Sequence, residues 1–397
     1  MDTYDAIVLG AGQAGLSASY HLRRLGVRHV VLDGDDAPGG AWQHRWDTLT
    51  MHDVHGVAAL PDAGSPAGAD GRANAVVPAY FAEYERVHAL PVLRPVRVER
   101  VTSPDGPDGL LVVHAGERRW ATRTLVNATG TWSQPHLPYY PGIETFRGEQ
   151  LHPVAYPGPA AFRGRRVLVV GGGASAVQLL GELAPVTETL WVTRREPVWR
   201  TDDFTPAAGR AAVALVADRV RRGLPPASVV SVTGLALREQ ERAAERLGAY
   251  ERHPMFTSIE PDGVRWADGH VEPVDVILWA TGFRPAIRHL APLHLRSGHG
   301  GIQLERDTTA VADRRVQLVG YGPSASTIGA NRAGRAAARG VVRRLEGTVG
   351  PGEMLSGWRG SGPRGGATTT GTVSSTRRGL PQRSAWAGTR ASSTPSS

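Results

Sequence analysis

Two glycine-rich turns of one kind constrain the fold of this chain more than any other feature. In the first turn, Gly10, Gly12 and Gly15 follow a short apolar run and precede an apolar-periodic segment that ends at Gly26. A buried strand, such a turn and a helix in this order direct the N–H groups of the helix N-terminus at a bound diphosphate. Asp33 closes the next apolar run, where an acid can bond a ribose hydroxyl.

The second turn repeats this unit near the middle of the chain. Gly171, Gly173 and Ala176 form the triplet, with Ser175 inside it. The following apolar run ends at Val192 and leads to Arg194 and Arg195, not to an acid. Paired arginines suit the 2′-phosphate of NADP, so we expect the second turn to bind NADPH and the first turn to bind another dinucleotide. Two solvated surface arginines are the alternative interpretation.

The repeat predicts an α/β fold with two Rossmann-like dinucleotide-binding domains, the second inserted in the first. A helix over 78–90, with Pro78 in its first turn, and a strand over 92–101 are expected in the first domain. After Gly350 the composition is rich in Gly, Ser, Thr, Pro and Arg and lacks apolar periodicity, so we expect a disordered tail. The expected segments are the first dinucleotide domain 1–155, the NADPH domain 156–285, the return segment of the first domain 286–348 and the tail 349–397.

Composition excludes several classes of function. The 397 residues contain no cysteine, which excludes the relay of a disulfide reductase, and no lysine, which excludes a Schiff base. Much of the net charge of +8 lies in the tail, so we expect no nucleic-acid partner. No run of 18 apolar residues and no signal peptide is present, so we expect a cytoplasmic protein without a membrane anchor. A homodimer is left open.

Further positions fit contact with a ligand. Gly40 and Trp42 place flexible backbone beside a bulky ring. Thr129 and Gly130 end one apolar run, and Thr281 and Gly282 end a later one in the same way. The cluster of His52, Asp53 and His55 fits no usual zinc spacing, and we expect no metal site.

The segment between the two turns carries a family resemblance. Phe146, Gly148, His152 and Tyr156 fit F-x-G-x-x-x-H-x-x-x-Y, and the chain resembles the class B flavoprotein monooxygenases of the flavin-containing monooxygenase type. The segments 39–42 and 280–285 resemble the G-G-x-W motif and the hinge motif of that family. The resemblance implies that the fingerprint residues form the domain hinge. It also implies that the first glycine turn, in 1–155 with 286–348, binds FAD and that the second, in 156–285, binds NADPH. Baeyer–Villiger members usually carry Trp where this chain has Tyr156, which favours oxygenation at nitrogen or sulfur.

The resemblance also implies a reaction. NADPH would reduce FAD, O2 would give a flavin hydroperoxide, and one oxygen atom would pass to a small organic substrate. His52 is the candidate catalytic residue, because many members have an Asn near this position beside the flavin. The chain thus departs from the family pattern at His52, and it departs again at Tyr321, where many related flavoproteins have Asp. The alternatives are an NADPH oxidase or flavin reductase that makes hydrogen peroxide, Baeyer–Villiger oxygenation of a ketone, and a non-enzymatic NADP sensor.

Overall fold

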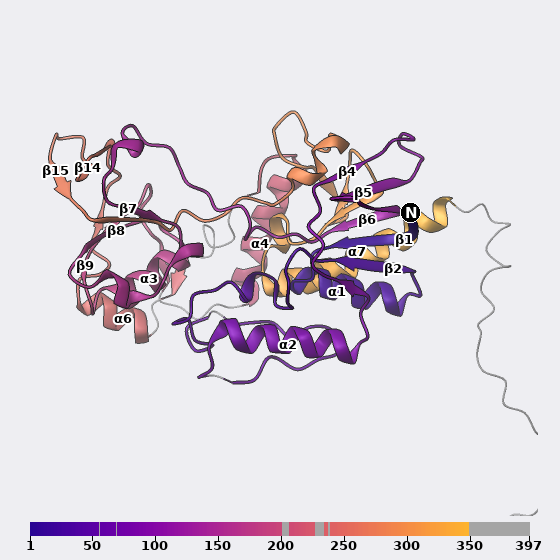
Figure 1. The fold of residues 1–397 in the computed structure, drawn as a ribbon, viewed down its shortest axis with the longest axis horizontal. Coiled ribbons are helices and arrows are strands. Elements are labelled where there is room, and N and C mark those ends of the chain that lie inside the picture. The colour runs from indigo at the N-terminus through magenta and orange to yellow at the C-terminus, as the bar shows by residue number, and fades with distance from the viewer. Residues whose placement is uncertain (55, 69, 201–205, 227–233, 237–238, 349–397) are drawn as a thin grey trace, which may run out of the picture. The chain divides into compact units, whose positions relative to one another are not determined.

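The computed structural model describes residues 1–348 except 55, 69, 201–205, 227–233 and 237–238 (Figure 1). The tail from residue 349, which we expected to be disordered, lies outside these residues. In the described part, the strands form two large sheets that each have a parallel core. The chain therefore has the α/β fold that the two glycine turns predict.

The first sheet has nine strands and begins with β1 (Asp2–Leu9) at its centre. β1 lies between β2 (His29–Leu32) and β6 (Arg118–Asn127) and is parallel to both. Its apolar half, Ala6 to Leu9, is buried on both faces, as expected of a central parallel strand. The other strands are β3 (Val92–Leu93), β4 (Arg100–Thr102), β5 (Leu111–Ala115), β17 (Leu304–Glu305), β18 (Thr309–Ala310) and β19 (Val316–Leu318).

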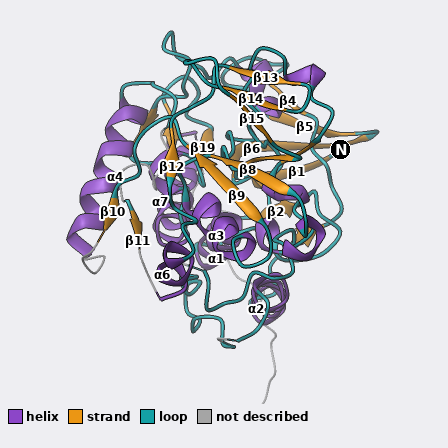
Figure 2. Ribbon diagram, turned by 90° about the vertical axis from the view of Figure 1, so that its left-hand side faces the viewer, coloured by secondary structure: helices purple, strands orange, loops and turns teal. Residues whose placement is uncertain are grey.

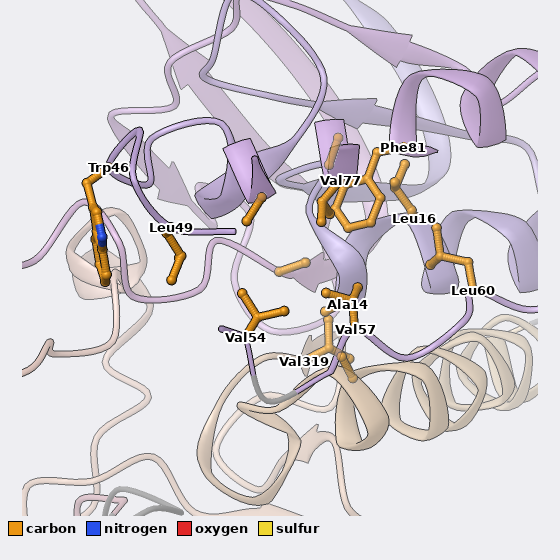
Figure 3. Close-up of a cluster of buried hydrophobic side chains, with 14 of the residues drawn as sticks. Ala14, Leu16, Trp46, Leu49, Val54, Val57, Leu60, Val77, Phe81 and Val319 are labelled. Carbon is orange, nitrogen blue, oxygen red and sulfur yellow. The ribbon is translucent and has the colours of Figure 1, made fainter. Parts of the chain in front are cut away.

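Helices α1 (Gln13–Arg24) and α7 (Thr327–Thr348) pack on this sheet, and a third long helix, α2 (Ala73–Val87), lies beside α1 (Figure 1). Figure 3 shows Val77 and Phe81 of α2 beside Leu16 of α1, within one buried apolar cluster. Because this packing fixes α1 against the strands, it also fixes the turn from which α1 starts.

The second sheet contains five parallel strands in the order β12-β9-β8-β16-β7. Helix α3 (Ala174–Leu183) follows β8 and leads to β9. The first sheet takes its strands from 2–127 and 304–318, and the second from 149–279, so the second unit is inserted in the first. The strands are β7 (Glu149–Leu151), β8 (Arg166–Val170), β9 (Glu188–Val192), β12 (Arg252–His253) and β16 (Val276–Trp279).

Smaller elements follow the second glycine unit (Figure 2). They include a three-stranded antiparallel sheet and a two-stranded parallel one. The elements are β10 (Trp199–Arg200), α4 (Pro206–Arg221), β11 (Leu235–Ala236), α6 (Glu239–Arg246), β13 (Ser258–Glu260), β14 (Gly263–Arg265) and β15 (Val271–Pro273).

Two local predictions were wrong. Helix α2 begins at Ala73, so Pro78 lies in its second turn and not in its first. The buried residues Ala73, Val77, Phe81 and Tyr84 recur at helical spacing, and their burial offsets the backbone bond that Pro78 cannot make. The strand expected over 92–101 is two short strands, β3 and β4, because the chain leaves the sheet at Pro95, which has no N–H to donate.

Candidate functional site

A cavity of about 460 Å³ lies at the carboxyl ends of the parallel strands of the first sheet. Its lining joins segments that are far apart in the sequence, from the first turn to the start of α7. Seven residues that the sequence singled out line it: Gly10, Gly12, Asp33, Gly40, Trp42, Thr129 and Gly130. Ligands of α/β folds bind at this edge of the sheet, which makes the cavity the candidate cofactor site.

The first glycine turn leaves the N-terminus of α1 open toward this cavity. Gly10 has a φ of 94°, and a Cβ there would lie 2.7 Å from the carbonyl oxygen of Ala128. A Cβ on Gly15 would overlap with the carbonyl oxygen of Gly10, so the helix can pack on the turn only through glycine. No side chain caps α1 at Gly12. The uncapped N–H groups face a cavity, which fits a diphosphate.

Asp33 is held at the end of β2 by two donors. Its Oδ1 accepts from the N–H of Ala11 at 3.2 Å, and its Oδ2 accepts from Nε of Arg94 at 3.0 Å. Arg94 also pairs with Glu85 at 2.7 Å. Burial raises the pKa of Asp33, while the Ala11 N–H and the Arg94 guanidinium act in the opposite direction. Arg94 is a residue that the sequence analysis missed, because no motif marks it.

An arginine and two tryptophans form another part of the cavity wall. The guanidinium of Arg45 lies 4.7 Å from the ring centre of Trp132 and 5.5 Å from that of Trp42. Trp132 in turn stacks on Phe283 at 5.1 Å. Trp42 was expected at a ligand, whereas Arg45 and Trp132 were missed. Both could have been suspected from their place in the sequence, because Arg45 follows Trp42 by three residues and Trp132 follows Gly130 by two.

A buried histidine completes the lining. Nε2 of His289 lies 2.6 Å from Oδ1 of Asn127, which accepts the hydrogen bond because Nδ2 of Asn127 donates to Thr129. Burial lowers the pKa of His289 to about 4. His289 is therefore neutral near pH 7. The hydroxyl of Thr129 donates to the carbonyl oxygen of Ala286 at 2.6 Å, which ties β6 to the returning chain.

The second glycine turn has the same local geometry as the first. Gly171 has a φ of 137° and packs against the carbonyl of Ala280, and no side chain caps α3 at Gly173. Ser175 and Ala176 lie in the first turn of α3, and Ala176 is buried. Free N–H groups at this helix end fit a second diphosphate.

Arg194 and Arg195 lie directly after β9, at the carboxyl edge of the second sheet, and both are exposed. The turn that carries them is held in place. The hydroxyl of Thr193 donates to the carbonyl oxygen of Arg195 at 2.6 Å and accepts from Nε of Arg252 at 2.8 Å. Arg252, which the sequence analysis missed, adds a third cation at this edge.

The four fingerprint residues lie at the boundary of the second sheet. Phe146 is buried, and a Cβ on Gly148 would overlap with the backbone of Asp275. Nε2 of His152 donates to the carbonyl oxygen of Gly282 at 3.0 Å, and its Nδ1 accepts from the N–H of Val154 at 3.4 Å. Both ring nitrogens are engaged and burial lowers the pKa of His152, so the side chain has a structural role.

Tyr156 joins a contact between the first unit and helix α3. Its hydroxyl donates to Oε2 of Glu182 at 3.3 Å, and Trp46 Nε1 donates to Oε1 of the same carboxylate at 2.7 Å. Thr48 donates at 2.5 Å. Burial raises the pKa of Glu182. The sequence analysis did not single out Glu182, which lies on an ordinary helix.

The remaining predicted positions lie elsewhere. His52 is exposed in the turn 50–53 and is not part of the cavity lining, so its catalytic role stays a prediction. The hydroxyl of Thr281 donates to the carbonyl oxygen of His136, and the carbonyl oxygen of Gly282 accepts from the N–H of His136 at 2.9 Å. Thr281 and Gly282 thus lie in the connection between the two units and outside the cavity lining.

Two further findings concern the described residues alone. None of their helices combines the length and the apolar character that crossing a bilayer requires. Over the same residues, no group of three or more His, Asp or Glu side chains is placed to hold a metal ion.

Comparison with known proteins gives consistent matches. The profile of the pyridine nucleotide-disulphide oxidoreductase family matches residues 7–212. A flavin-containing monooxygenase structure from Stenotrophomonas maltophilia is 38% identical, with a TM-score of 0.74, over 87% of this chain and 100% of that one. The oxidoreductase CzcO of Bacillus subtilis is 27% identical over 71% of this chain and 81% of its own length. A Baeyer–Villiger monooxygenase of Streptomyces coelicolor is 30% identical over 55% of this chain and 44% of its own length.

Proposed function

Because the chain belongs to the pyridine nucleotide-disulphide oxidoreductase family, and within it to the class B flavoprotein monooxygenases, we propose that it oxygenates nitrogen or sulfur atoms with NADPH as electron donor. The chain is an FAD-dependent monooxygenase that also uses a nicotinamide cofactor. NADPH preference and the atom that is oxygenated are the proposed part. We assign FAD to the unit of the first sheet and NADPH to the inserted unit, whose strand β7 lies before the boundary at 155 and 156 that the sequence suggested.

The observation that carries NADPH preference is the pair Arg194 and Arg195 at the end of β9. In a dinucleotide fold this position faces the adenosine ribose, where an acid favours the 2′-hydroxyl of NAD and arginine favours the 2′-phosphate of NADP. Both side chains are exposed, and neither forms an ion pair with an acid among the described residues. Their donors are therefore available to a dianion.

Some residues of the cavity bind the cofactor, and others keep water away from it. When bound, FAD supplies the redox and oxygen chemistry. The N-terminus of α1 binds its diphosphate, and Asp33 binds a ribose hydroxyl. Trp42 and Trp132 cover part of the cavity with apolar surface, which keeps water from the reacting atoms. A soft nucleophile needs no protein base to accept an oxygen atom, so neutral His289 need not move a proton.

NADPH preference is tested by replacing Arg194 and Arg195 with Ala. We expect KM for NADPH to rise about tenfold or more while KM for NADH changes little, because each arginine contributes a charge-assisted hydrogen bond to the 2′-phosphate. Arg163→Ala, an exposed arginine before β8, is the control and should change neither value. Equal losses for both cofactors in the double variant would show that the arginines do not bind the 2′-phosphate.

The oxygenated atom is tested with matched substrates. A thioether, a tertiary amine and a cyclic ketone are each supplied with NADPH and O2, and product and hydrogen peroxide are measured against NADPH consumed. We expect sulfoxide or N-oxide from the first two and little lactone. Lactone as the main product would assign Baeyer–Villiger oxygenation instead. Peroxide equal to NADPH consumed with all three would assign an NADPH oxidase.

A further inference from the structure

Arg45 lies in the wall of the cofactor cavity. In the part of the chain that the structure describes, its guanidinium takes part in no ion pair, and its Nε is buried without a hydrogen-bond partner. The buried acid of this lining differs, because Asp33 pairs with Arg94, and the other arginine of the lining, Arg97, is exposed to solvent. An unpaired, partly buried cation lowers the stability of the folded chain unless a ligand supplies the missing charge.

The guanidinium of Arg45 lies over two aromatic rings, with its Cζ 4.7 Å from the ring centre of Trp132 and 5.5 Å from that of Trp42. These cation–π contacts partly compensate its desolvation. Cation–π contacts leave the N–H groups at the edge of the guanidinium free to donate. This edge belongs to a residue that lines the cavity, so donors and positive charge are both presented to whatever binds there.

The guanidinium of Arg45 stays charged at neutral pH. Burial lowers the pKa of Arg45 to about 10, which is still well above neutral pH. The partner that this edge fits is an anion with two or more oxygen atoms, which a guanidinium can bind through parallel hydrogen bonds. We propose that Arg45 forms an anion-binding site in the cavity, and that it binds either an anionic group of the cofactor or the carboxylate of an organic acid substrate.

The proposal assumes that FAD binds in this cavity, but it needs neither NADPH preference nor oxygenation at nitrogen or sulfur. The test uses the full chain with Arg45→Met, which keeps a long side chain beside the two indoles and removes the charge, and Arg45→Lys, which keeps the charge. Arg118→Met is the matched control, because Arg118 also stacks on a tryptophan, Trp120, at 4.7 Å, but outside the cavity.

Three measurements separate the two sources of the anion. FAD affinity is measured by flavin fluorescence after the bound FAD is removed and added back, and the reduction potential of bound FAD is measured by dye equilibration. Benzoate and its neutral analogue benzamide are compared as inhibitors. If the cofactor supplies the anion, Arg45→Met should bind FAD about tenfold more weakly or lower its potential. If a substrate supplies it, benzoate inhibition should weaken about tenfold and benzamide inhibition should stay unchanged.

A melting experiment covers the case in which a variant folds poorly. Without FAD, Arg45→Met should melt at the same temperature as the parent or higher, since an unpaired charge has been removed. Unchanged FAD affinity, potential and benzoate inhibition in Arg45→Met would overturn the proposal. So would a melting temperature of the FAD-free Arg45→Met protein clearly below that of the parent, because this result would show that Arg45 acts through packing. Arg45→Lys, which keeps the charge but not the parallel donors, should lose no more than Arg45→Met; a larger loss in Arg45→Lys would also overturn the proposal.

Discussion

At the scale of single residues, His289 links protonation to the integrity of the cavity. Its ring is buried and donates to Asn127, and burial lowers its pKa to about 4, below the ordinary value of about 6.5. A histidine that is neutral in the folded state must gain a proton when the chain unfolds at low pH. Its contribution to stability is therefore present above pH 6.5 and is lost as the pH falls toward 4.

We expect the free energy of unfolding to fall by about 2 to 3 kcal/mol between pH 7 and pH 4.5 on account of His289. His289→Gln, which can still donate to Asn127, should remove this part of the pH dependence. Urea unfolding of the FAD-free protein at several pH values measures it. His299→Gln, an exposed histidine, is the control. A parallel pH dependence in the parent and His289→Gln would contradict the assigned role.

The residues that the sequence predicts well are those whose role follows from backbone geometry. Gly10, Gly12 and Asp33 line the cavity because a strand, a turn and a helix place them there through local structure alone. Arg45, His289 and Glu182 could not be predicted in this way. Each acquires its environment from segments that meet only in the folded chain, such as Trp132 against Arg45 and Asn127 against His289.

At the scale of elements, strand and helix types were easier to predict than their limits. The apolar runs at the starts of both nucleotide units are the buried strands β1 and β8. The start of α2 was misplaced because a proline near a helix end is a statistical signal, whereas burial of Phe81 and its neighbours decides where the helix forms. Long-range packing therefore outweighed the local signal in this helix.

The packing of α1 on the first turn leads to a prediction at this scale. In Gly15→Ala the new Cβ would overlap with the carbonyl oxygen of Gly10, which is backbone and cannot rotate away. We expect α1 to shift, with a loss of stability of about 1 to 3 kcal/mol and much weaker FAD binding. Thermal melting and retained flavin absorbance report the two effects.

Gly298→Ala provides the comparison, because no atom lies within 4 Å of a Cβ built on Gly298. This variant should keep both the melting temperature and the flavin of the parent. If Gly15→Ala behaved in the same way, α1 would not depend on glycine for its approach to the turn, and the close packing described for this helix would be wrong.

At the scale of the whole described chain, Glu182 connects the two nucleotide-binding units. It lies on α3 of the inserted unit and accepts hydrogen bonds from Trp46 and Thr48, which belong to the first unit. Gln178 of the same helix donates to the carbonyl oxygen of Asp53 at 2.8 Å. Hydride transfer requires that the two cofactors meet, so contacts between the units set the geometry in which they do so.

Removal of this carboxylate should loosen the connection. Glu182→Ala leaves the buried N–H of Trp46 and the buried hydroxyl of Tyr156 without an acceptor, and we expect a loss of about 2 to 4 kcal/mol in the free energy of unfolding. Thr48→Ala should cost less, because Thr48 is exposed and its partner keeps two other donors.

Because burial raises the pKa of Glu182, the contribution of Glu182 to stability is largest at low pH and declines as the pH rises through the pKa of the folded state. The difference in stability between the parent and Glu182→Ala, measured by urea unfolding, should therefore shrink with increasing pH; a difference that grows with pH would show that the ionised carboxylate is the form that holds the two units together.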